Sequence, residues 1–244
     1  METWLVLSGF FAAAINAVAG GGPVLTLAAL VAAGIDPRIA NLTSTVALCP
    51  GQLVAGWEAR DGLASLRSRG YAPATAIAIA LLGGMAGAGL LLVTASDHFR
   101  EIIPWLILIA TALYGFSGRA AHLSTRRRLA PSTLQVAMGG SAIYGGYFGG
   151  GNSFIVLALL SVAGLEASQG ARAKNVLVAC FNLGAVTVFA SSGAVDWRAA
   201  AAVGAGGIAG SWVGMRVLNR IDPRLVRPIV ITCGVALAAW FLVS

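Results

Sequence analysis

Eight stretches of the chain contain no Asp, Glu, Lys, Arg or His, and this feature constrains the fold more than any other. They cover residues 3–35, 39–57, 70–96, 102–118, 129–165, 175–195, 199–215 and 228–244. A helix that spans a bilayer needs about 20 predominantly apolar residues. Charged residues make up only 10% of the chain, whereas soluble domains carry about 25%. We therefore predict an all-α polytopic membrane protein with about eight hydrophobic segments.

Two of these runs have a length that fits neither one straight span nor two. As a single helix, residues 3–35 would be about 50 Å long, against a hydrocarbon core of about 30 Å. This run contains Gly20–Gly22 followed by Pro23, and the run 129–165 contains Gly149–Gly151 followed by Asn152. Gly and Pro are unfavourable inside helices. A break at each triplet leaves two geometries, a bent single crossing or a re-entrant hairpin that enters and leaves on one side.

The two halves of the chain carry matching landmarks. The Gly triplets are 129 residues apart. With a two-residue insertion, three further matches follow at an offset of 131, namely Thr43-Ser44 with Lys174-Asn175, Cys49 with Cys180, and Gly62 with Gly193. The spacing indicates an internal duplication.

The distribution of basic residues distinguishes the two geometries. If each broken run crosses the membrane once, the repeats are parallel and eight of the 16 Lys and Arg residues lie on each side. If each run is a re-entrant hairpin, the repeats are inverted, with 13 basic residues inside and three outside. Cytoplasmic loops are enriched in Lys and Arg. We therefore predict two inverted repeats, each a broken-helix hairpin plus three transmembrane helices, with both termini outside.

These considerations predict the organisation of the chain. Repeat 1 occupies residues 1–118, with a hairpin at 3–35 and spans at 39–57, 71–95 and 102–118. A basic cytoplasmic linker follows at residues 119–131. Repeat 2 occupies residues 132–244, with a hairpin at 132–164 and spans at 175–195, 199–218 and 225–244.

Inverted hairpins bring both Gly tips near the middle of the bilayer, and paired helix breaks indicate a transporter binding site. Pro23 suits the first position of the following helix, and Asn152 or Ser153 can cap its counterpart. Both helices would direct their positive N-terminal ends at the centre, which favours an anion. The alternative is that the triplets only allow close helix packing.

The same residues carry a family resemblance. The stretch NAVAGGGPVLTLAALVAAGIDPRIANLTSTVA, with GGYFGGGNSF and SGAVDWR in the second half, resembles the TauE/SafE family of sulfite exporter-like permeases. The resemblance covers essentially the whole chain. It implies transport of small sulfur-containing anions, such as sulfite or organosulfonates, across the cell membrane. The sequence departs from the family pattern where Lys174-Asn175 replaces the Thr-Ser pair of the first half.

The candidate substrate-binding residues are the two tips and the spans that follow them. They are Gly20, Gly21, Gly22, Pro23, Thr43, Ser44, Gly149, Gly150, Gly151, Asn152, Ser153, Lys174 and Asn175. A second, weaker group comprises Asn16, Cys49, Gln52, Tyr147, Cys180 and Asn182.

Each of these residues also has a purely structural interpretation. Lys174 can be an interfacial lysine, the Thr and Ser hydroxyls can bond to the preceding helical turn, and the cysteines can be small packing residues. We also expect Pro50-Gly51 and Asn182 to unwind their spans and widen the cavity.

The sequence favours a secondary transporter over other functions. No His, Asp or Glu lies inside a span, so an intramembrane enzyme is disfavoured. A transporter or channel for another small anion is the alternative. We expect no cofactor and no metal. We also expect no nucleic acid partner, because the arginines lie in short loops between spans, where membrane topology explains the positive charge. The expected partners are the lipid bilayer of the cell membrane and a small anion. A coupling proton or sodium ion and a homodimer are left open.

Overall fold

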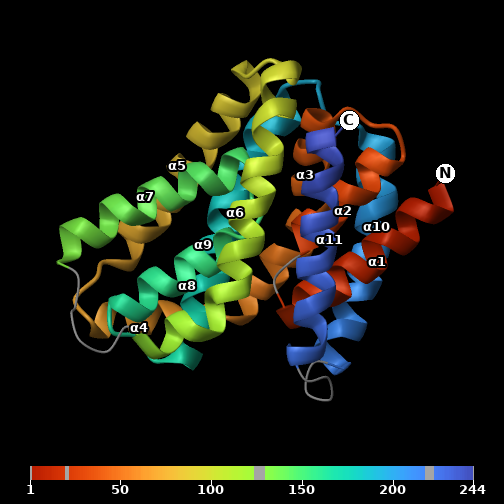
Figure 1. Ribbon diagram of the computed structural model, residues 1–244. Helices are drawn as coiled ribbons and strands as arrows, with labels where there is room; N and C mark the ends of the chain where they lie inside the picture. The colour runs from red at the N-terminus through yellow and green to blue at the C-terminus, as the bar shows by residue number, and fades with distance from the viewer. Residues whose placement is uncertain (1, 20–21, 124–129, 218–222, 244) are drawn as a thin grey trace.

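The computed structural model describes residues 2–19, 22–123, 130–217 and 223–243, and these form eleven helices (Figure 1). The helices are α1 (Glu2–Ala19), α2 (Gly22–Ala32), α3 (Pro37–Glu58), α4 (Gly62–Ser68), α5 (Pro73–Val93), α6 (Ser96–Leu123), α7 (Pro131–Tyr147), α8 (Asn152–Val162), α9 (Ala167–Ser191), α10 (Trp197–Val217) and α11 (Pro223–Val243). The prediction of an all-helical chain is confirmed for the described residues.

Local sequence signals explain where several helices begin. Proline occupies the first position of α3, α5 and α7, where its missing N–H costs nothing. Asp36 caps α3, because its Oδ1 accepts the backbone N–H of Arg38 at 3.0 Å and of Ile39 at 3.3 Å. Glu166 caps α9 in a capping box with Gln169.

The ends of α2 and α8 are built alike. Gly34 follows α2 with a φ of +86°, and Gly164 follows α8 with a φ of +87°. The next residue then donates its N–H five residues back, from Ile35 to Leu30 and from Leu165 to Leu160. This is the Schellman arrangement, which only glycine adopts without strain. Each loop turns the chain from a short helix into a long one.

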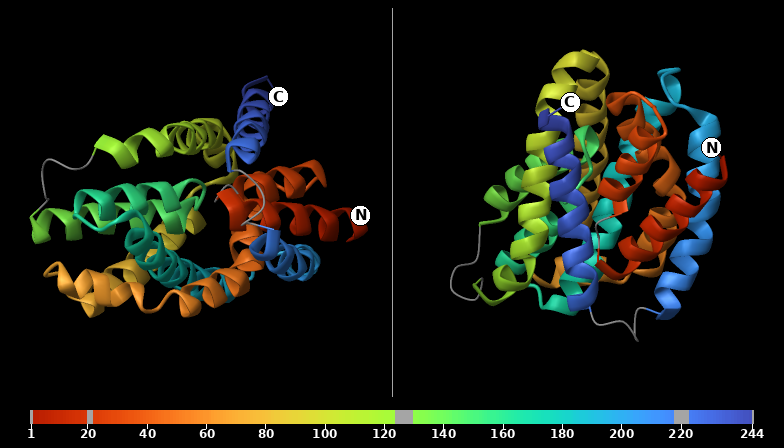
Figure 2. Two further views of the ribbon diagram at one scale, coloured as in Figure 1. Left: turned by 90° about the horizontal axis from the view of Figure 1, so that it is seen from below. Right: turned by 45° about the vertical axis from the view of Figure 1, so that its right-hand side comes forward.

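The helices form three layers when the molecule is seen from below (Figure 2, left). Helices α6 and α11 run side by side as one outer layer, and α3, α5, α9 and α10 form the other. The pairs α1–α2 and α7–α8 lie between these layers. The α7–α8 pair opens toward the lower left in Figure 1, and helices α3, α6 and α10 end in the lower part of the molecule. We call this the lower end, and the opposite end the upper end.

The packing partners of the two halves correspond. Helix α1 packs along α10, and α7 packs along α5. Helix α2 contacts α3, as α8 contacts α9. Helices α3 and α9 contact each other, and so do α6 and α11. Each half of the chain therefore places its first helix against a long helix of the other half.

Glycines permit these helices to approach closely. A Cβ on Gly9 would lie 2.2 Å from the Val203 carbonyl oxygen, and one on Gly206 would lie 1.9 Å from the Val6 oxygen, at the α1–α10 contact. At the α5–α7 contact, a Cβ on Gly146 would lie 2.1 Å from the Gly84 oxygen. Small residues at such crossings are typical of helix packing in membranes. Part of the glycine content is thus explained by packing rather than by the breaks.

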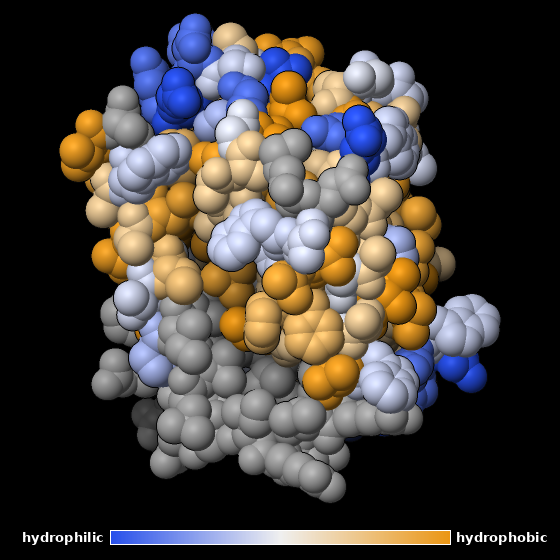
Figure 3. Space-filling model, turned by 90° about the vertical axis from the view of Figure 1, so that its right-hand side faces the viewer, coloured by the Kyte–Doolittle hydropathy of each residue, from blue (hydrophilic) through white to orange (hydrophobic). Residues whose placement is uncertain are grey.

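The surface of the molecule suits a bilayer. Helices Pro73–Val93 and Ser168–Ser191 are long and apolar enough, by length and composition, to cross a membrane. Large apolar side chains are widely exposed, including Leu82, Val136 and Ile208. Figure 3 shows a broad hydrophobic area on one face, with hydrophilic residues gathered at its upper end. A soluble protein rarely exposes so much contiguous apolar surface.

The structure corrects three details of the sequence prediction. Residues 62–68, predicted as part of a loop, form the short helix α4, which buries Leu66. The predicted unwinding at Pro50-Gly51 and at Asn182 is wrong, because α3 and α9 continue through these positions. Helix α6 extends to Leu123 into the predicted linker, of which residues 124–129 lie outside the described residues.

Candidate functional site

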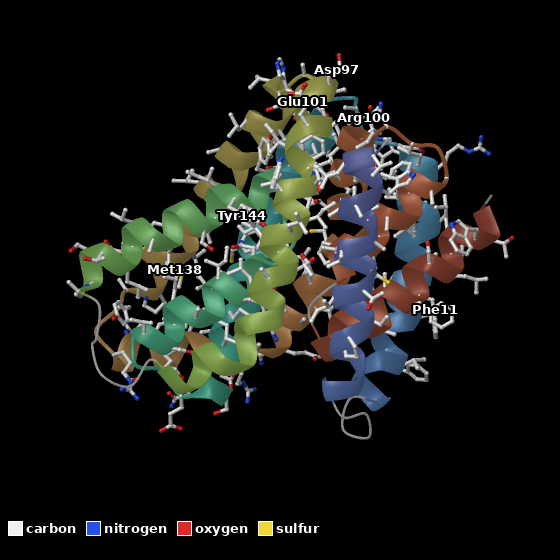
Figure 4. All side chains as sticks on the ribbon, in the orientation of Figure 1. Phe11, Asp97, Arg100, Glu101, Met138 and Tyr144 are labelled. Atoms are coloured by element: carbon white, nitrogen blue, oxygen red, sulfur yellow. The ribbon has the colours of Figure 1, made fainter. Side chains whose placement is uncertain are left out.

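The break between α7 and α8 consists of Phe148 and three glycines. Gly149 and Gly151 have φ values of +77° and +73°, a conformation that costs an L-residue about 1–2 kcal/mol. The Tyr144 hydroxyl donates to the Gly150 carbonyl at 2.8 Å and holds the turn against α7. Figure 4 places Tyr144 at the centre of the molecule. The predicted break at this triplet is therefore present, and it lies inside the helix bundle.

Asn152 is the most unusual polar residue at this tip. Its side chain is 0% exposed, and its Oδ1 accepts a hydrogen bond from the Ser141 hydroxyl at 2.6 Å. Its Nδ2 is buried and has no hydrogen-bond partner among the described residues. A Cβ on Gly145 would lie 2.2 Å from this nitrogen and 2.8 Å from Cε2 of Phe181. The free amide thus lies in a narrow space against α7 and the Phe181 ring.

The expected capping role of Asn152 or Ser153 is wrong. Gly151 is the N-cap residue of α8, and no side chain caps this end. Asn152 begins the helix one position later and turns its amide toward Ser141 on α7. Gly151, in the left-handed conformation, therefore occupies the N-cap position that was predicted for Asn152 or Ser153.

Only the second half of the first break can be described. Gly20 and Gly21 lie outside the described residues, as does the side chain of Asn16. Gly22 is buried and begins α2, and Pro23 occupies its second position. The Thr26 hydroxyl donates to the carbonyl of Gly22 or Pro23, both 3.1 Å away, and it shares a hydrogen bond with the hydroxyl of Ser44. Ser44 therefore packs against α2 within one turn of the break.

Sequence reasoning missed Thr26, which is fully buried. The signal was its position three and four residues after Pro23 and Gly22, where a hydroxyl reaches back to the carbonyls of the first turn after the break.

The hydroxyls of Thr43 and Thr45, on either side of Ser44, bond to other parts of the chain than α2. The Oγ1 of Thr43 is buried and accepts the backbone N–H of Asp196 at 3.2 Å, in the loop before α10. Thr45 bonds back to the Asn41 carbonyl within α3, as its structural interpretation expects. The first hairpin and Thr43 are thus not brought together by any hydrogen bond of the described residues.

Asn41 is a second residue that sequence reasoning missed. It is 4% exposed, and its Nδ2 donates to the Tyr147 carbonyl at 2.9 Å. Tyr147 is the last residue of α7, so this bond ties α3 of the first half to the tip of the second. The Tyr147 hydroxyl also donates to Thr94 Oγ1 at 3.4 Å, just beyond the end of α5.

Lys174 and Asn175 lie in the third turn of α9, toward the lower end, and both are partly exposed. Lys174 makes no hydrogen bond or ion pair with the described part of the chain. By contrast, the neighbouring Arg172 pairs with Asp61, with Nε 2.8 Å from Oδ1. Because helical positions three, four and seven apart share a face, Lys174 lies on the side of α9 that carries Leu177 and Phe181.

The remaining weaker candidates are largely explained by packing. Cys49 is buried in α3 and Cys180 is partly exposed in α9. Asn182 donates to the Val178 carbonyl one turn back at 2.9 Å. Gln52 retains a buried Oε1 without a partner among the described residues. No group of three or more His, Cys, Asp or Glu suited to a metal occurs within the described ranges.

A small apolar cavity lies beside the second tip, between α5, α7, α8 and α9. Phe181 forms part of its wall and also borders the Asn152 amide. Met138, labelled in Figure 4, lies on the same wall toward the open end of the α7–α8 pair. The full lining is Ala76, Ala80, Met138, Ala142, Val156, Leu177 and Phe181. All the side chains that line this cavity are apolar, so the polar groups of the tip have an apolar cavity beside them.

Comparison with known proteins identifies the family of this chain. The family described as "Sulfite exporter TauE/SafE" matches residues 5–241. The probable membrane transporter protein YfcA of Escherichia coli is 28% identical over 240 residues, which cover 97% of this chain and 86% of that protein. A probable membrane transporter protein of Haemophilus influenzae is 27% identical over 236 residues, which cover 95% and 90%.

The probable membrane transporter protein ORF9 of Sinorhizobium is 28% identical over 241 residues, which cover 96% of this chain and 90% of that protein. No solved structure matches the chain significantly. The prediction of a multi-pass membrane transporter, rather than an enzyme, is confirmed by these relationships. The chain belongs to the TauE/SafE family of membrane transporters.

Proposed function

We propose that this protein is a secondary transporter of small sulfur oxyanions, sulfite or an organosulfonate, and that the anion binds at the helix breaks. The observation that carries the proposal is the free amide of Asn152 at the start of α8, fully buried and without a partner among the described residues. A buried donor left unpaired costs about 1–3 kcal/mol. A site that binds an acceptor group during transport accounts for this cost.

The chemistry of the tip suits an oxyanion. The positive end of the α8 dipole and the Asn152 N–H group both favour negative charge. Two backbone N–H groups of this end are already used in turns, from Asn152 to Gly149 at 3.4 Å and from Phe154 to Gly151 at 3.0 Å. The side-chain amide of Asn152 adds to this end a donor that no described residue uses. The sulfur-containing class rests on the description of the family.

Inverted repeats are supported by the packing of the two halves. The pairs α1–α10 and α7–α5 are related by exchange of the halves, as are α2–α3 and α8–α9. The antiparallel α6 and α11 in Figure 1 fit a two-fold axis in the membrane plane. The helix ends that precede or follow most of the basic residues lie at the lower end, which we assign to the cytoplasm. Alternating access then occurs around the two tips.

Asn152 is tested by replacing it together with the hydroxyl that bonds to it. The double variant Asn152→Leu/Ser141→Ala removes the free donor without leaving a hydroxyl unpaired. We expect anion affinity to fall roughly 10–100-fold, because a hydrogen bond to a charged group is worth about 1.5–3 kcal/mol. In detergent, a bound anion at 100 times its dissociation constant stabilises by about 2.7 kcal/mol. The double variant should lose this thermal shift and the flux into liposomes.

A panel of sulfite, methanesulfonate, sulfate, acetate and phosphate makes the test specific. The matched control is Ser161→Ala, because the Ser161 hydroxyl bonds only to the Leu157 carbonyl at 2.9 Å, at the far end of α8. No thermal shift of the wild type with any anion would contradict the proposal. Single-channel currents would instead support the channel alternative.

Lys174 is proposed as the cation that receives the anion on the cytoplasmic side. We expect Lys174→Gln to lower flux at subsaturating anion by roughly tenfold, since it removes the unpaired charge on the Phe181 face of α9. Flux into reconstituted vesicles measures this effect. The control is Arg172→Gln, which breaks an ion pair exposed by 54% and 58%. Such a pair contributes less than about 1 kcal/mol, and flux should remain. Equal effects of the two variants would show that Lys174 acts only through surface charge.

A further inference from the structure

Arg38, at the upper end of the bundle, is a cation without a carboxylate partner among the described residues. It is the second residue of α3 and is partly buried. Its Nη2 donates to the Leu92 carbonyl at 3.1 Å, while its Nε is buried and has no hydrogen-bond partner among the described residues. The nearest acid in the sequence, Asp36, uses its Oδ1 to cap α3. Among the described residues, one backbone carbonyl is therefore the only hydrogen-bond acceptor of the guanidinium group.

The surroundings of Arg38 connect it with the tip of α7. Asn41, one turn further along α3, donates to the Tyr147 carbonyl. The Tyr147 hydroxyl reaches Thr94, two residues beyond the Leu92 that accepts from Arg38. Arg38, Asn41 and Tyr147 thus line the junction of α3, α5 and α7. Tyr147 is in turn five residues before Asn152, across the glycine break.

A purely structural role explains only part of this arrangement. An Arg at the last turn of α5 satisfies a terminal carbonyl and interacts favourably with the helix dipole. That role uses one of the five donors of the guanidinium and leaves Nε unused. A partly buried charge without a counter-ion is costly, so such groups are usually paired. The fork formed by Nε and an Nη matches two oxygens of an oxyanion.

We propose that Arg38 binds the transported oxyanion at the upper end, as a second station between the solvent and Asn152. This inference rests on the proposed function. It adds to that function the residue that binds the anion on the side of the membrane opposite Lys174. The Nε–H and a free Nη–H of Arg38 would donate to two oxygens of sulfite or a sulfonate. Lys174 would receive the same anion at the opposite end. Arg38 and Lys174 would then place, toward each face of the membrane, a cation that has no ion-pair partner among the described residues.

The experiment measures KM from each side separately. Radiolabelled sulfite is given to right-side-out and to inverted membrane vesicles from cells that produce the full chain. For Arg38→Gln we expect KM to rise at least about tenfold from the upper face, with KM from the lower face changed less than about twofold. Arg38→Lys should give an intermediate KM, because it keeps the charge but loses the planar fork.

Arg100 provides the matched control. It is exposed near the start of α6 at the same end (Figure 4), so Arg100→Gln removes a charge from that face without touching the junction. An equal KM rise in Arg100→Gln would overturn the inference in favour of general surface charge. A fall in Vmax and thermal stability with KM unchanged would show that Arg38 only stabilises α5. If the wild type neither transports nor binds any anion, the proposed function fails, and this inference fails with it.

Discussion

Replacing Gly151 with valine is expected to abolish anion flux and to lower the free energy of unfolding by about 2–4 kcal/mol. Gly151 has a φ of +73°, which a β-branched residue essentially never adopts. A Cβ at this position would also lie 2.8 Å from the Ala110 Cα and 2.9 Å from its Cβ. Helix α6 and the start of α8 would have to separate. Because Asn152 is the next residue, its amide would move away from Ser141 and Phe181.

Flux per folded molecule and the unfolding midpoint are the two measurements. Gly193→Val is the matched control, because Gly193 has a φ of +70° but nothing within 4 Å of its Cβ position. It should lose about 1–2 kcal/mol from backbone strain alone and keep its flux. Wild-type flux in Gly151→Val would show that transport does not depend on the geometry of the second tip.

Much of the helix layout was readable from the sequence, because it follows from local rules. Proline fixes the starts of α3, α5 and α7, and charge-free runs mark long apolar helices. The break at Gly149–Gly151 follows in the same way, since two of its residues need a positive φ. Helix α4 was missed because seven residues with two hydroxyl side chains and an arginine carry too little periodicity to be recognised.

The partners within the site could not be read from the sequence. Asn41 and Tyr147 are 106 residues apart, and Thr26 and Ser44 come from helices whose relative rotation is set by packing. Hydrophobic pattern gives little help, because a helix in lipid is apolar on all sides. The continuity of α3 through Pro50 also depends on tertiary packing, which the sequence does not reveal. Neighbouring helices and local adjustments can satisfy the freed carbonyl, so the proline does not end the helix.

The crossing of α5, α7 and α9 gives the other large effect. A Cβ on Gly84 would lie 2.0 Å from the Phe181 carbonyl oxygen and 2.8 Å from the Phe181 Cα. The Gly84 carbonyl is in turn the atom that a Cβ on Gly146 would meet, at 2.1 Å. Both contacts are with backbone, so no flexible side chain can move aside. We expect Gly84→Ala to force α9 and α5 apart and to remove most folded protein.

Gly89 in the same helix is the control that separates packing from composition. Nothing lies within 4 Å of its Cβ position, so Gly89→Ala should be neutral or stabilising by about 0.5–1 kcal/mol, the usual helix preference for alanine. Size-exclusion profiles and unfolding midpoints of the two variants compare them directly. An unchanged midpoint in Gly84→Ala would mean that α5 and α9 do not approach at this point. Since Phe181 also borders the Asn152 amide, a small shift of α9 that keeps the fold should still lower anion affinity. Gly84 thus links the packing of the long helices to the position of the site.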